Sequence, residues 1–322
     1  ENEAQEYAHM TADNAIAEWA ELNIEEINSE IENFGDLDYD MLGLKDAEVE
    51  DLPSEQEDED EAPEPEPNPV TRRGDIWVLG DHRVMCGDST LIDDFEKLMS
   101  GEKADITFTS PPYNANTKTG DGDIYNGKKS KKLYGKGYSD NLKSEDYIDF
   151  AKEVLENCFI YTSKFIFWNS NYNANSRFEY IKQIEDRLEN LIEQVCWKKS
   201  STIPFKGSLM REWEPIYLFS VSGEGLDLKN VFSNFWEIGN TDSQQENHKA
   251  CFPVALPEKG ISLVISNSEI VLDPFCGSGS TLIASEKTNR KCYGMELDEK
   301  YCDVTIKRWQ DFTGSEAKLE ST

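Results

Sequence analysis

The fold of this chain is decided by the stretch Val271–Thr281, whose sequence is VLDPFCGSGST. An apolar run ends at Asp273, two glycines follow at Gly277 and Gly279, and a helix-forming segment comes next. Glycine lets the backbone approach a ligand without a Cβ clash, and the N-terminus of the next helix offers its N–H groups. We therefore predict a strand, a ligand-binding turn and a helix.

A carboxylate stands at the end of the next apolar strand, Lys291–Glu296, about twenty residues after Asp273. In a nucleotide-binding βαβ unit, an acid at this position accepts hydrogen bonds from ribose hydroxyls. The glycine spacing departs from the GxGxxG pattern of dinucleotide sites, which disfavours NAD. The turn alone is compatible with a purely structural role, but together with Glu296 it indicates a site for a nucleoside cofactor.

A second candidate site is the sequence TSPPY at Thr109–Tyr113, directly after the apolar run Ala104–Thr109. In such folds ligands bind at the carboxyl ends of the strands. Pro111 and Pro112 fix the backbone and leave carbonyls as its available polar groups. The Ser110 hydroxyl and a proline carbonyl can bind both hydrogens of an NH2 group, the carbonyl dipole would stabilise positive charge on its nitrogen, and Tyr113 can stack on the ring. A Pro-Pro turn that merely ends a strand is the structural alternative.

Alternating strands and helices around these motifs predict an α/β fold with a doubly wound, mostly parallel sheet. We expect a hairpin at 75–86, helices near 90–100, 144–162, 174–190, 279–288 and 299–312, and strands at 104–109, 164–168, 191–197, 215–220, 269–272 and 291–296. The polar stretch 114–143 has too few apolar residues for a core element, so we expect a functional or disordered loop. The predicted catalytic domain spans residues 71–315, and a short tail follows at 316–322.

The acidity of the chain is concentrated at one end. The net charge is −32, of which residues 1–69 hold −24 and residues 70–322 only −8. We predict an acidic helical segment over residues 1–50 and a flexible linker rich in Glu, Asp and Pro over residues 51–70. An acidic spacer is the simplest role for the linker, and competition for a basic DNA groove is the alternative. Because the remainder is only mildly acidic, the total charge does not exclude a nucleic-acid partner.

Composition argues against several other classes of protein. The seven cysteines are scattered without a CxxC pair, which disfavours a zinc site or a disulfide framework and indicates a reducing cytoplasm. No run of about 18 apolar residues is present, so we expect no membrane span. No metal site is expected.

The two motifs, Ser110–Tyr113 and Phe275–Gly279, resemble those of the DNA amino-methyltransferases, (Asp/Asn/Ser)-Pro-Pro-(Tyr/Phe) and Phe-x-Gly-x-Gly. Here the proline motif comes first, which is the permuted order of the β class of that family. The resemblance covers most of residues 74–313. It implies a Rossmann-like fold, S-adenosylmethionine as cofactor, double-stranded DNA as substrate and a bacterial or phage origin. It is compatible with a homodimer, and it leaves restriction–modification, orphan regulation and phage defence open as roles.

The same resemblance assigns roles to single residues. Asp88 would lie near the cofactor adenine, Asp273 would approach the methionine amino group, and Phe275 would pack near the methionine or the target base. Phe252 and Pro253 belong to a segment that closes over the cofactor. The predicted cofactor site is therefore Asp88, Phe252, Pro253, Asp273, Pro274, Phe275, Gly277, Gly279 and Glu296, and the predicted catalytic site is Ser110, Pro111, Pro112 and Tyr113.

Two basic segments are candidates for contact with DNA. The loop after Tyr113 interleaves lysines with tyrosines, which suit phosphates and unpaired bases, and a second segment follows the strand at 191–197. The DNA-binding residues that we predict are Lys118, Lys128, Lys129, Lys131, Lys132, Lys136, Lys198 and Lys199. Solvated surface loops are the alternative for both segments.

The N-terminal stretch carries a second resemblance. The sequence TADN at Thr11–Asn14, followed by Glu18-Trp19 and Gly43-Leu44, resembles the C-terminal end of a ParB-like domain fused ahead of such methyltransferases. On this interpretation the rest of that domain is missing from the chain. An independent helical element is the alternative.

The target base must be flipped out of the duplex to reach a buried cofactor. In the family, Ser at the first motif position commonly accompanies cytosine N4 and Asp accompanies adenine N6, with exceptions. The resemblance favours cytosine N4, and adenine N6 is the alternative. An RNA or protein-amide methyltransferase, a catalytically silent DNA-binding module and a dehydrogenase also remain as hypotheses, although glutamine-amide methyltransferases have the reverse motif order.

Overall fold

The computed structural model of the chain divides into two units, Glu1–Gln56 and Glu57–Thr322. It describes residues 59–114, 124–125, 128–129, 142–170, 179–199, 212–226, 232–239, 252–264 and 270–320. The predicted N-terminal helices and the ParB-like stretch lie outside the described residues, so both stay predictions. None of the described helices combines the length and the apolar composition that a membrane span requires.

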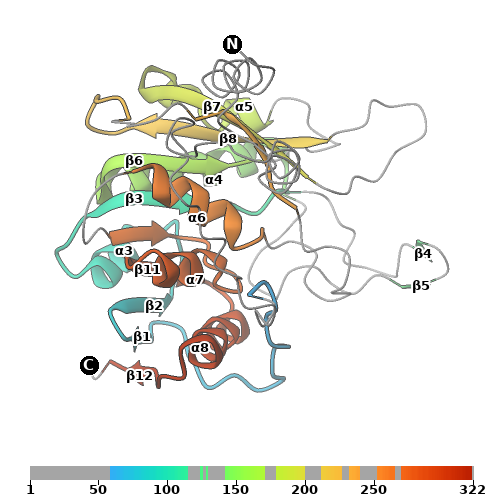
Figure 1. Cartoon of the computed structure of the whole chain (residues 1–322), viewed down its shortest axis with the longest axis vertical. Coiled ribbons are helices and arrows are strands. Elements are labelled where there is room, and N and C mark those ends of the chain that lie inside the picture. Colours follow the sequence, from blue (N-terminus) through green and yellow to red (C-terminus); the bar gives the residue numbers. More distant parts are fainter. Residues whose placement is uncertain are drawn as a thin grey trace, which may run out of the picture. The chain divides into compact units, whose positions relative to one another are not determined.

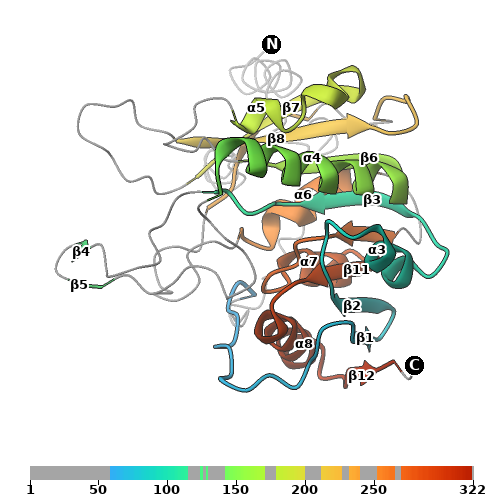
Figure 2. The ribbon, with the colours of Figure 1, turned by 180° about the vertical axis from the view of Figure 1, so that it is seen from behind.

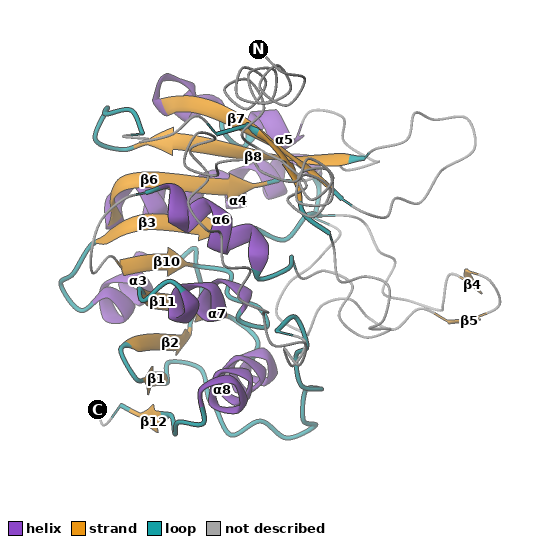
Figure 3. Cartoon of the chain, viewed as in Figure 1, coloured by secondary structure: helices purple, strands orange, loops and turns teal. Residues whose placement is uncertain are grey.

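One sheet organises the second unit (Figure 3). Its described strands follow the order β12-β1-β2-β11-β10-β3-β6-β8-β7-β9. They are β1 Ile76–Leu79, β2 His82–Cys86, β3 Ala104–Thr109, β6 Thr162–Asn169, β7 Leu191–Lys198, β8 Trp213–Ser220, β9 Phe235–Glu237, β10 Ile270–Asp273, β11 Lys291–Glu296 and β12 Lys318–Leu319. A separate pair, β4 Ile124–Tyr125 and β5 Lys128–Lys129, is antiparallel.

The centre of the sheet is parallel. Neighbouring strands run parallel from β2 through β11, β10 and β3 to β6. Antiparallel pairs join β1 to β12 and to β2 on one side, and β8 to β6 and to β7 on the other. The predicted α/β fold with a mostly parallel sheet is therefore confirmed.

Helices cover both faces of the sheet. They are α3 Ile92–Met99, α4 Ser144–Tyr161, α5 Glu179–Lys182, α6 Ala255–Leu263, α7 Ser280–Lys287 and α8 Glu299–Thr313, with a 3₁₀ helix at Glu185–Asn190. In Figure 1, α6, α7 and α8 lie on the near face. In Figure 2, which shows the sheet from behind, α3, α4 and α5 lie in front. The result is a three-layer arrangement with helices on both sides of the central strands (Figure 1 and Figure 2).

Local sequence explains these elements. All four residues of β10 are buried, as expected for a central parallel strand. In α4 the buried residues Ala151, Val154, Leu155 and Cys158 recur at helical spacing. In α8 the Asp298 side chain caps the N-terminus by accepting from the Lys300 N–H, and Gly314 ends the helix with a φ of +69°.

The core is divided by the sheet. On the α4 side, Ala151, Leu155 and Cys158 pack with Trp168 of β6 and Phe219 of β8. On the other side, α6, α7 and α8 contribute residues that pack with β3, β10 and β11. A smaller group packs α3 against β2, β10 and β11. This packing holds the strand ends that carry both motifs in fixed positions.

Most predicted elements are found within a few residues of their expected bounds, but the helix predicted at 174–190 is wrong as a single helix. Of this range the structure describes 179–190, where the short α5 is followed by a 3₁₀ turn. The buried Gln183 accepts a hydrogen bond from the Trp168 indole N–H and donates to the Ser170 hydroxyl, so contacts with β6 interrupt the helix. Strands β9 and β12 were not predicted either, and the pair β4–β5 lies inside the predicted loop.

The segments on either side of the predicted catalytic domain make contacts that the sequence does not indicate. Glu59 and Asp60, from the predicted linker, pair with Lys287 and accept from the Val254 N–H, respectively. The tail contributes β12, where Lys318 and Leu319 pair with β1. The flexibility proposed for the linker as a whole stays a prediction.

Candidate active site

The strand order brings the ends of the two strands that carry the motifs side by side. From β10 the chain passes through α7 to β11 on one side, and from β3 it passes through α4 to β6 on the other. Strands β10 and β3 are neighbours, so the direction of winding changes between them. In open α/β sheets ligands bind outside the carboxyl ends of strands at such a point. Asp273 and Ser110 lie at these ends.

A buried hydrogen bond connects the motifs. The Thr109 hydroxyl donates to Asp273 Oδ1 at 2.7 Å, and both residues are fully buried. The Phe275 N–H donates to the same oxygen at 3.0 Å. Burial raises the pKa of Asp273 to about 6, because desolvation outweighs the hydrogen bonds that the carboxylate accepts. A cation near this carboxylate would therefore be stabilised.

The glycine-rich turn has the predicted form, and side chains of α8 donate hydrogen bonds to its carbonyls. Gly277 and Gly279 have φ values of +56° and +90°, which disfavour any residue with a Cβ. The Thr305 hydroxyl donates to the Gly277 carbonyl at 2.8 Å, and the buried Arg308 donates to the Ser278 carbonyl at 3.1 Å. The turn is thus held by side chains that sequence reasoning did not single out.

Glu296 lies beside this turn at the end of β11. Its Oε2 accepts from the Gly277 N–H at 3.0 Å, and its Oε1 accepts from the Asp298 N–H at 2.8 Å. Burial raises the pKa of Glu296 to about 7, because these hydrogen bonds offset only part of the desolvation. Among the described residues no cation pairs with it. A buried carboxylate of this kind suits hydroxyl donors such as those of a ribose.

Asp88 is brought to the same edge of the sheet. The Gly87 N–H donates to the Glu296 carbonyl at 2.9 Å, so the segment after β2 runs beside the end of β11. Asp88 Oδ1 accepts from the N–H and the hydroxyl of Thr90, at 3.0 and 2.8 Å. The Ser89 hydroxyl donates to the Pro274 carbonyl. Three predicted cofactor segments are therefore tied together.

The remaining predicted cofactor residues contact β3, α4 and the start of α6. The Phe252 ring meets the Phe108 ring of β3 edge-on, with 5.8 Å between centroids. Pro253 is buried, and its carbonyl accepts from the Leu256 N–H at the start of α6. The Phe275 ring lies 5.9 Å from that of Phe150 on α4. Aromatic rings thus line β3 and the turn after β10.

The proline motif is embedded in a polar network. The Ser110 hydroxyl lies 2.7 Å from the Tyr113 hydroxyl, which in turn lies 2.7 Å from Asn169 Oδ1. Tyr113 also approaches Glu214 Oε2 at 3.4 Å. Asn169 and Glu214, at the ends of β6 and β8 that meet the motif, were not predicted as site residues. The sequence feature that could have indicated Asn169 is its position as a polar residue directly after the apolar run of β6.

The predicted DNA-binding lysines are only partly described. Lys128 and Lys129 form β5, and Lys118, Lys131, Lys132 and Lys136 lie outside the described residues. Lys198 pairs with Glu237. Lys199 pairs with the buried Glu214 at 2.5 Å and lies over the Trp197 ring. DNA contact by these lysines stays a prediction.

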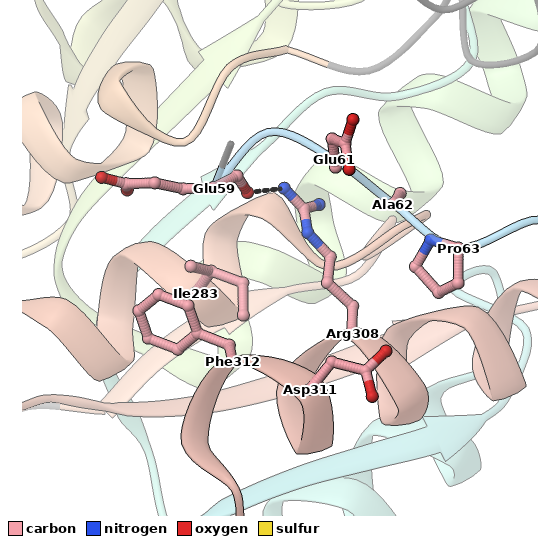
Figure 4. A pocket seen from close by; sticks show the side chains of 8 residues that line it. All are labelled: Glu59, Glu61, Ala62, Pro63, Ile283, Arg308, Asp311 and Phe312. Carbon is pink, nitrogen blue, oxygen red and sulfur yellow. Dashed lines mark hydrogen bonds between the residues drawn. The ribbon is translucent and has the colours of Figure 1, made fainter. Parts of the chain in front are cut away.

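A pocket is present where the segment before β1 meets α7 and α8 (Figure 4). Figure 4 shows the Arg308 guanidinium turned toward the Glu59 carbonyl, to which it donates at 2.6 Å. The pocket is lined by Glu59, Glu61, Ala62, Pro63, Ile283, Arg308, Asp311 and Phe312. None of these belongs to the predicted site, and the acidic groups outnumber the single cation.

Comparison with known proteins gives a match to one family. The family model described as DNA methylase, of the N6 and N4 type, matches residues 104–307. This range contains both motifs and Glu296.

Three curated relatives illustrate the similarity. The type II methyltransferase M.BglI of Bacillus subtilis is 29% identical over 156 residues, which are 48% of this chain and 37% of that protein. The orphan methyltransferase M.BamHII of Bacillus amyloliquefaciens is 33% identical over 93 residues, 27% of this chain and 35% of that protein. M.HpaI of Haemophilus parainfluenzae, a type II methyltransferase, is 23% identical over 258 residues, which are 71% of this chain and 74% of that protein. The chain spans less than half the length of the first relatives that it matches.

Solved structures show the same fold. The cytosine-N4-specific PvuII DNA methyltransferase superposes with a TM-score of 0.53 at 18% identity, over 72% of this chain and 87% of that one. A putative DNA modification methylase from Thermus thermophilus superposes with a TM-score of 0.50 at 20% identity, over 73% of this chain and 97% of that one.

Proposed function

Because this chain belongs to the N6/N4 DNA methylase family, we propose that it transfers a methyl group from S-adenosylmethionine to an exocyclic amino group of a base in double-stranded DNA. The observation that carries this function is the hydrogen bond between Thr109 and Asp273 at 2.7 Å. It joins the ends of β3 and β10, so a cofactor at the glycine-rich turn and a base at the proline motif would meet.

The residues at the ends of β10 and β11 fit this cofactor. Glu296 and Asp273 are buried carboxylates without a cationic partner among the described residues, which suits ribose hydroxyls at one and a cationic amino group at the other. Among the described residues, a Cβ on Gly277 would meet only the Phe275 carbonyl oxygen, at 3.8 Å, so these residues leave room above the turn. The carboxylate acceptors and the space at Gly277 therefore match a nucleoside with a charged side chain.

The chain's residues would hold the cofactor at one end and the base at the other. Gly277, Gly279 and Glu296 bind the nucleoside, Asp88 lies at its adenine, and Asp273 faces the amino group. Phe252, Pro253, Pro274 and Phe275 enclose it: Phe252 is half-buried against Phe108, and Pro274 is buried. When bound, S-adenosylmethionine supplies an electrophilic methyl group on a sulfonium sulfur.

The proline motif would orient the base. Ser110 Oγ and the Pro111 carbonyl accept the two amino hydrogens, which directs the nitrogen lone pair toward the methyl group. Pro112 keeps that loop rigid, and Tyr113 stacks on the ring. The fixed carbonyl dipole stabilises the positive charge that develops on the nitrogen, and no cysteine is required.

Cytosine N4 is the proposed target atom, with adenine N6 as the alternative. Ser110 occupies the first position of the proline motif, and its neutral hydroxyl is a weaker acceptor than the carboxylate that commonly accompanies adenine N6. The lysines at positions 118, 128, 129, 131, 132, 136, 198 and 199 are proposed to neutralise phosphates, and a homodimer and a preceding ParB-like domain are further proposals.

The first test is nucleoside mass spectrometry on mixed-sequence DNA, after incubation with the protein and isotopically labelled S-adenosylmethionine. Label in N4-methylcytosine supports the full proposal, and label in N6-methyladenine changes the base. Absence of label from both, while RNA or protein becomes labelled in parallel incubations, would contradict DNA as the substrate.

A pair of variants tests the site. Tyr113→Ala should abolish transfer while cofactor still binds in calorimetry, because the base loses its stacking partner. Tyr293→Ala on β11 removes an equal ring outside the motif and should leave transfer intact. Full turnover by Tyr113→Ala would contradict the assigned role.

A further inference from the structure

Asn169 is a buried polar residue that the proposed mechanism does not yet use. It ends β6 and is fully buried. Because Trp168 pairs with Thr109, the end of β6 lies beside the start of the proline motif. Asn169 Oδ1 is 2.7 Å from the Tyr113 hydroxyl and 3.3 Å from the Ser110 hydroxyl. Its Nδ2 has no hydrogen-bond partner among the described residues, so its contacts with the motif are made by the oxygen alone.

These contacts have a direction. An amide oxygen can only accept, so the single hydroxyl proton of Tyr113 points to Asn169. A further neighbour of that hydroxyl, Glu214 at 3.4 Å, is an acceptor as well. The proton between Ser110 and Tyr113, which are 2.7 Å apart, must then come from Ser110. Among the described residues, both hydroxyl protons are therefore engaged within the network, and lone pairs of Ser110 Oγ remain available to a ligand.

Glu214 and Lys199 reinforce this direction. Glu214 lies on β8, where Ile216 pairs with Asn169, and its carboxylate is held by Lys199 at 2.5 Å. The Tyr113 hydroxyl therefore faces two acceptors and would gain nothing by turning its proton toward Ser110.

We propose that Asn169 is a positioning residue that fixes the Ser110 oxygen as a hydrogen-bond acceptor for the amino group of the target base. The inference rests on the proposed function and names how its site selects an NH2 group over a carbonyl. Without the Asn169 oxygen, the Ser110 hydroxyl can rotate its proton toward the base, where it opposes an amino hydrogen but suits a carbonyl oxygen.

Kinetics of variants provide one test. Asn169→Leu removes the acceptor and should lower kcat about 100-fold, while the KM for S-adenosylmethionine changes less than about twofold. Asn169→Asp keeps an oxygen at the same place and should recover a large part of this loss. If Asn169 acts through Ser110, then Asn169→Leu adds no further loss in a Ser110→Ala background. Gln183→Leu is the matched control, because Gln183 is a buried amide that contacts Trp168 and Ser170 but not the motif.

A measurement without turnover tests the direction itself. A 3-fluorotyrosine placed at position 113 reports its hydroxyl titration by fluorine NMR. Loss of an acceptor for the hydroxyl proton destabilises the neutral phenol, so Asn169→Leu should move the titration midpoint to lower pH. Loss of a donor to the phenolate should move it to higher pH in Ser110→Ala.

The outcomes separate this inference from the proposed function. Absence of any methyl transfer by the wild-type protein refutes the function, and the fluorine midpoints then decide the hydrogen-bond direction alone. Opposite shifts support the inference, and shifts in the same direction overturn it. With an active enzyme, multiplicative losses in the double variant, or an equal loss in Gln183→Leu, would also overturn it.

Discussion

The two glycines of the turn should respond to alanine in opposite ways, because their surroundings differ. A Cβ on Gly279 would lie 2.9 Å from Thr305 Cγ2, and its φ of +90° already disfavours alanine. Backbone strain costs about 1–2 kcal/mol and overpacking about 1–3 kcal/mol, so Gly279→Ala should lose about 3 kcal/mol of unfolding free energy. Gly277 has a φ of +56°, and no described neighbour would come closer to its Cβ than 3.8 Å, so its alanine variant should lose only about 1 kcal/mol.

The binding effects should be reversed. A Cβ on Gly277 enters the space proposed for the nucleoside, so Gly277→Ala should weaken S-adenosylmethionine binding about tenfold or more, a cost of at least about 1.4 kcal/mol. Chemical denaturation measures the stabilities, and calorimetry measures the affinities. Thr305→Ser removes the clashing methyl but keeps the hydroxyl that donates to the Gly277 carbonyl at 2.8 Å. It should therefore restore the overpacking part of the Gly279→Ala loss and leave the backbone strain.

Two results would refute this reasoning. Equal stability losses in the two alanine variants would show that the contact with Thr305 does not decide the turn's geometry. Unchanged cofactor affinity in Gly277→Ala would show that the nucleoside does not lie above this residue.

Three further predictions concern buried polar groups. Burial raises the pKa of Glu296 to about 7 and that of Asp273 to about 6, so the folded state binds more protons than the unfolded chain between about pH 4 and 7. The stability that these groups contribute is present at low pH and is lost as pH rises through the folded pKa values. Chemical denaturation from about pH 4 to pH 8 checks this by measuring the free energy of unfolding. Glu296→Gln should make that free energy depend less on pH. Thr109→Val should cost about 2 kcal/mol near pH 8, where Asp273 is ionised, and about 1 kcal/mol near pH 5; an equal loss at both would contradict the buried charge. Asp60→Ala removes the acceptor of the Val254 N–H and should lower stability by about 1 kcal/mol in the same assay, whereas no loss would show that this contact is not maintained in solution.

The unit around the glycine-rich turn could be predicted because its determinants are local. Strand β11 was predicted at its observed bounds, Lys291–Glu296, and β3 at Ala104–Thr109, since a short apolar run between polar residues admits few alternatives. The two-stranded hairpin around Gly80 followed from its turn residues in the same way.

Elements that depend on distant partners could not be predicted. Strand β12 has two residues and forms because Lys318 and Leu319 pair with β1 on the side away from β2. The helix expected at 174–190 is interrupted near Gln183, which makes hydrogen bonds with Trp168 and Ser170. These partners lie at the end of β6, so helical periodicity in the sequence gives no sign of the break.

The sequence by itself determined which chemical groups are available: a proline-rich acceptor loop, a glycine-rich turn and an acid at the end of the next strand. Tertiary structure decided how they are joined. Parallel strands placed Thr109 against Asp273 across 164 positions of sequence and put Asn169 beside Ser110 and Tyr113. The direction of a hydrogen bond and the desolvation of a carboxylate depend on which groups surround them, and strands remote in sequence supply those groups.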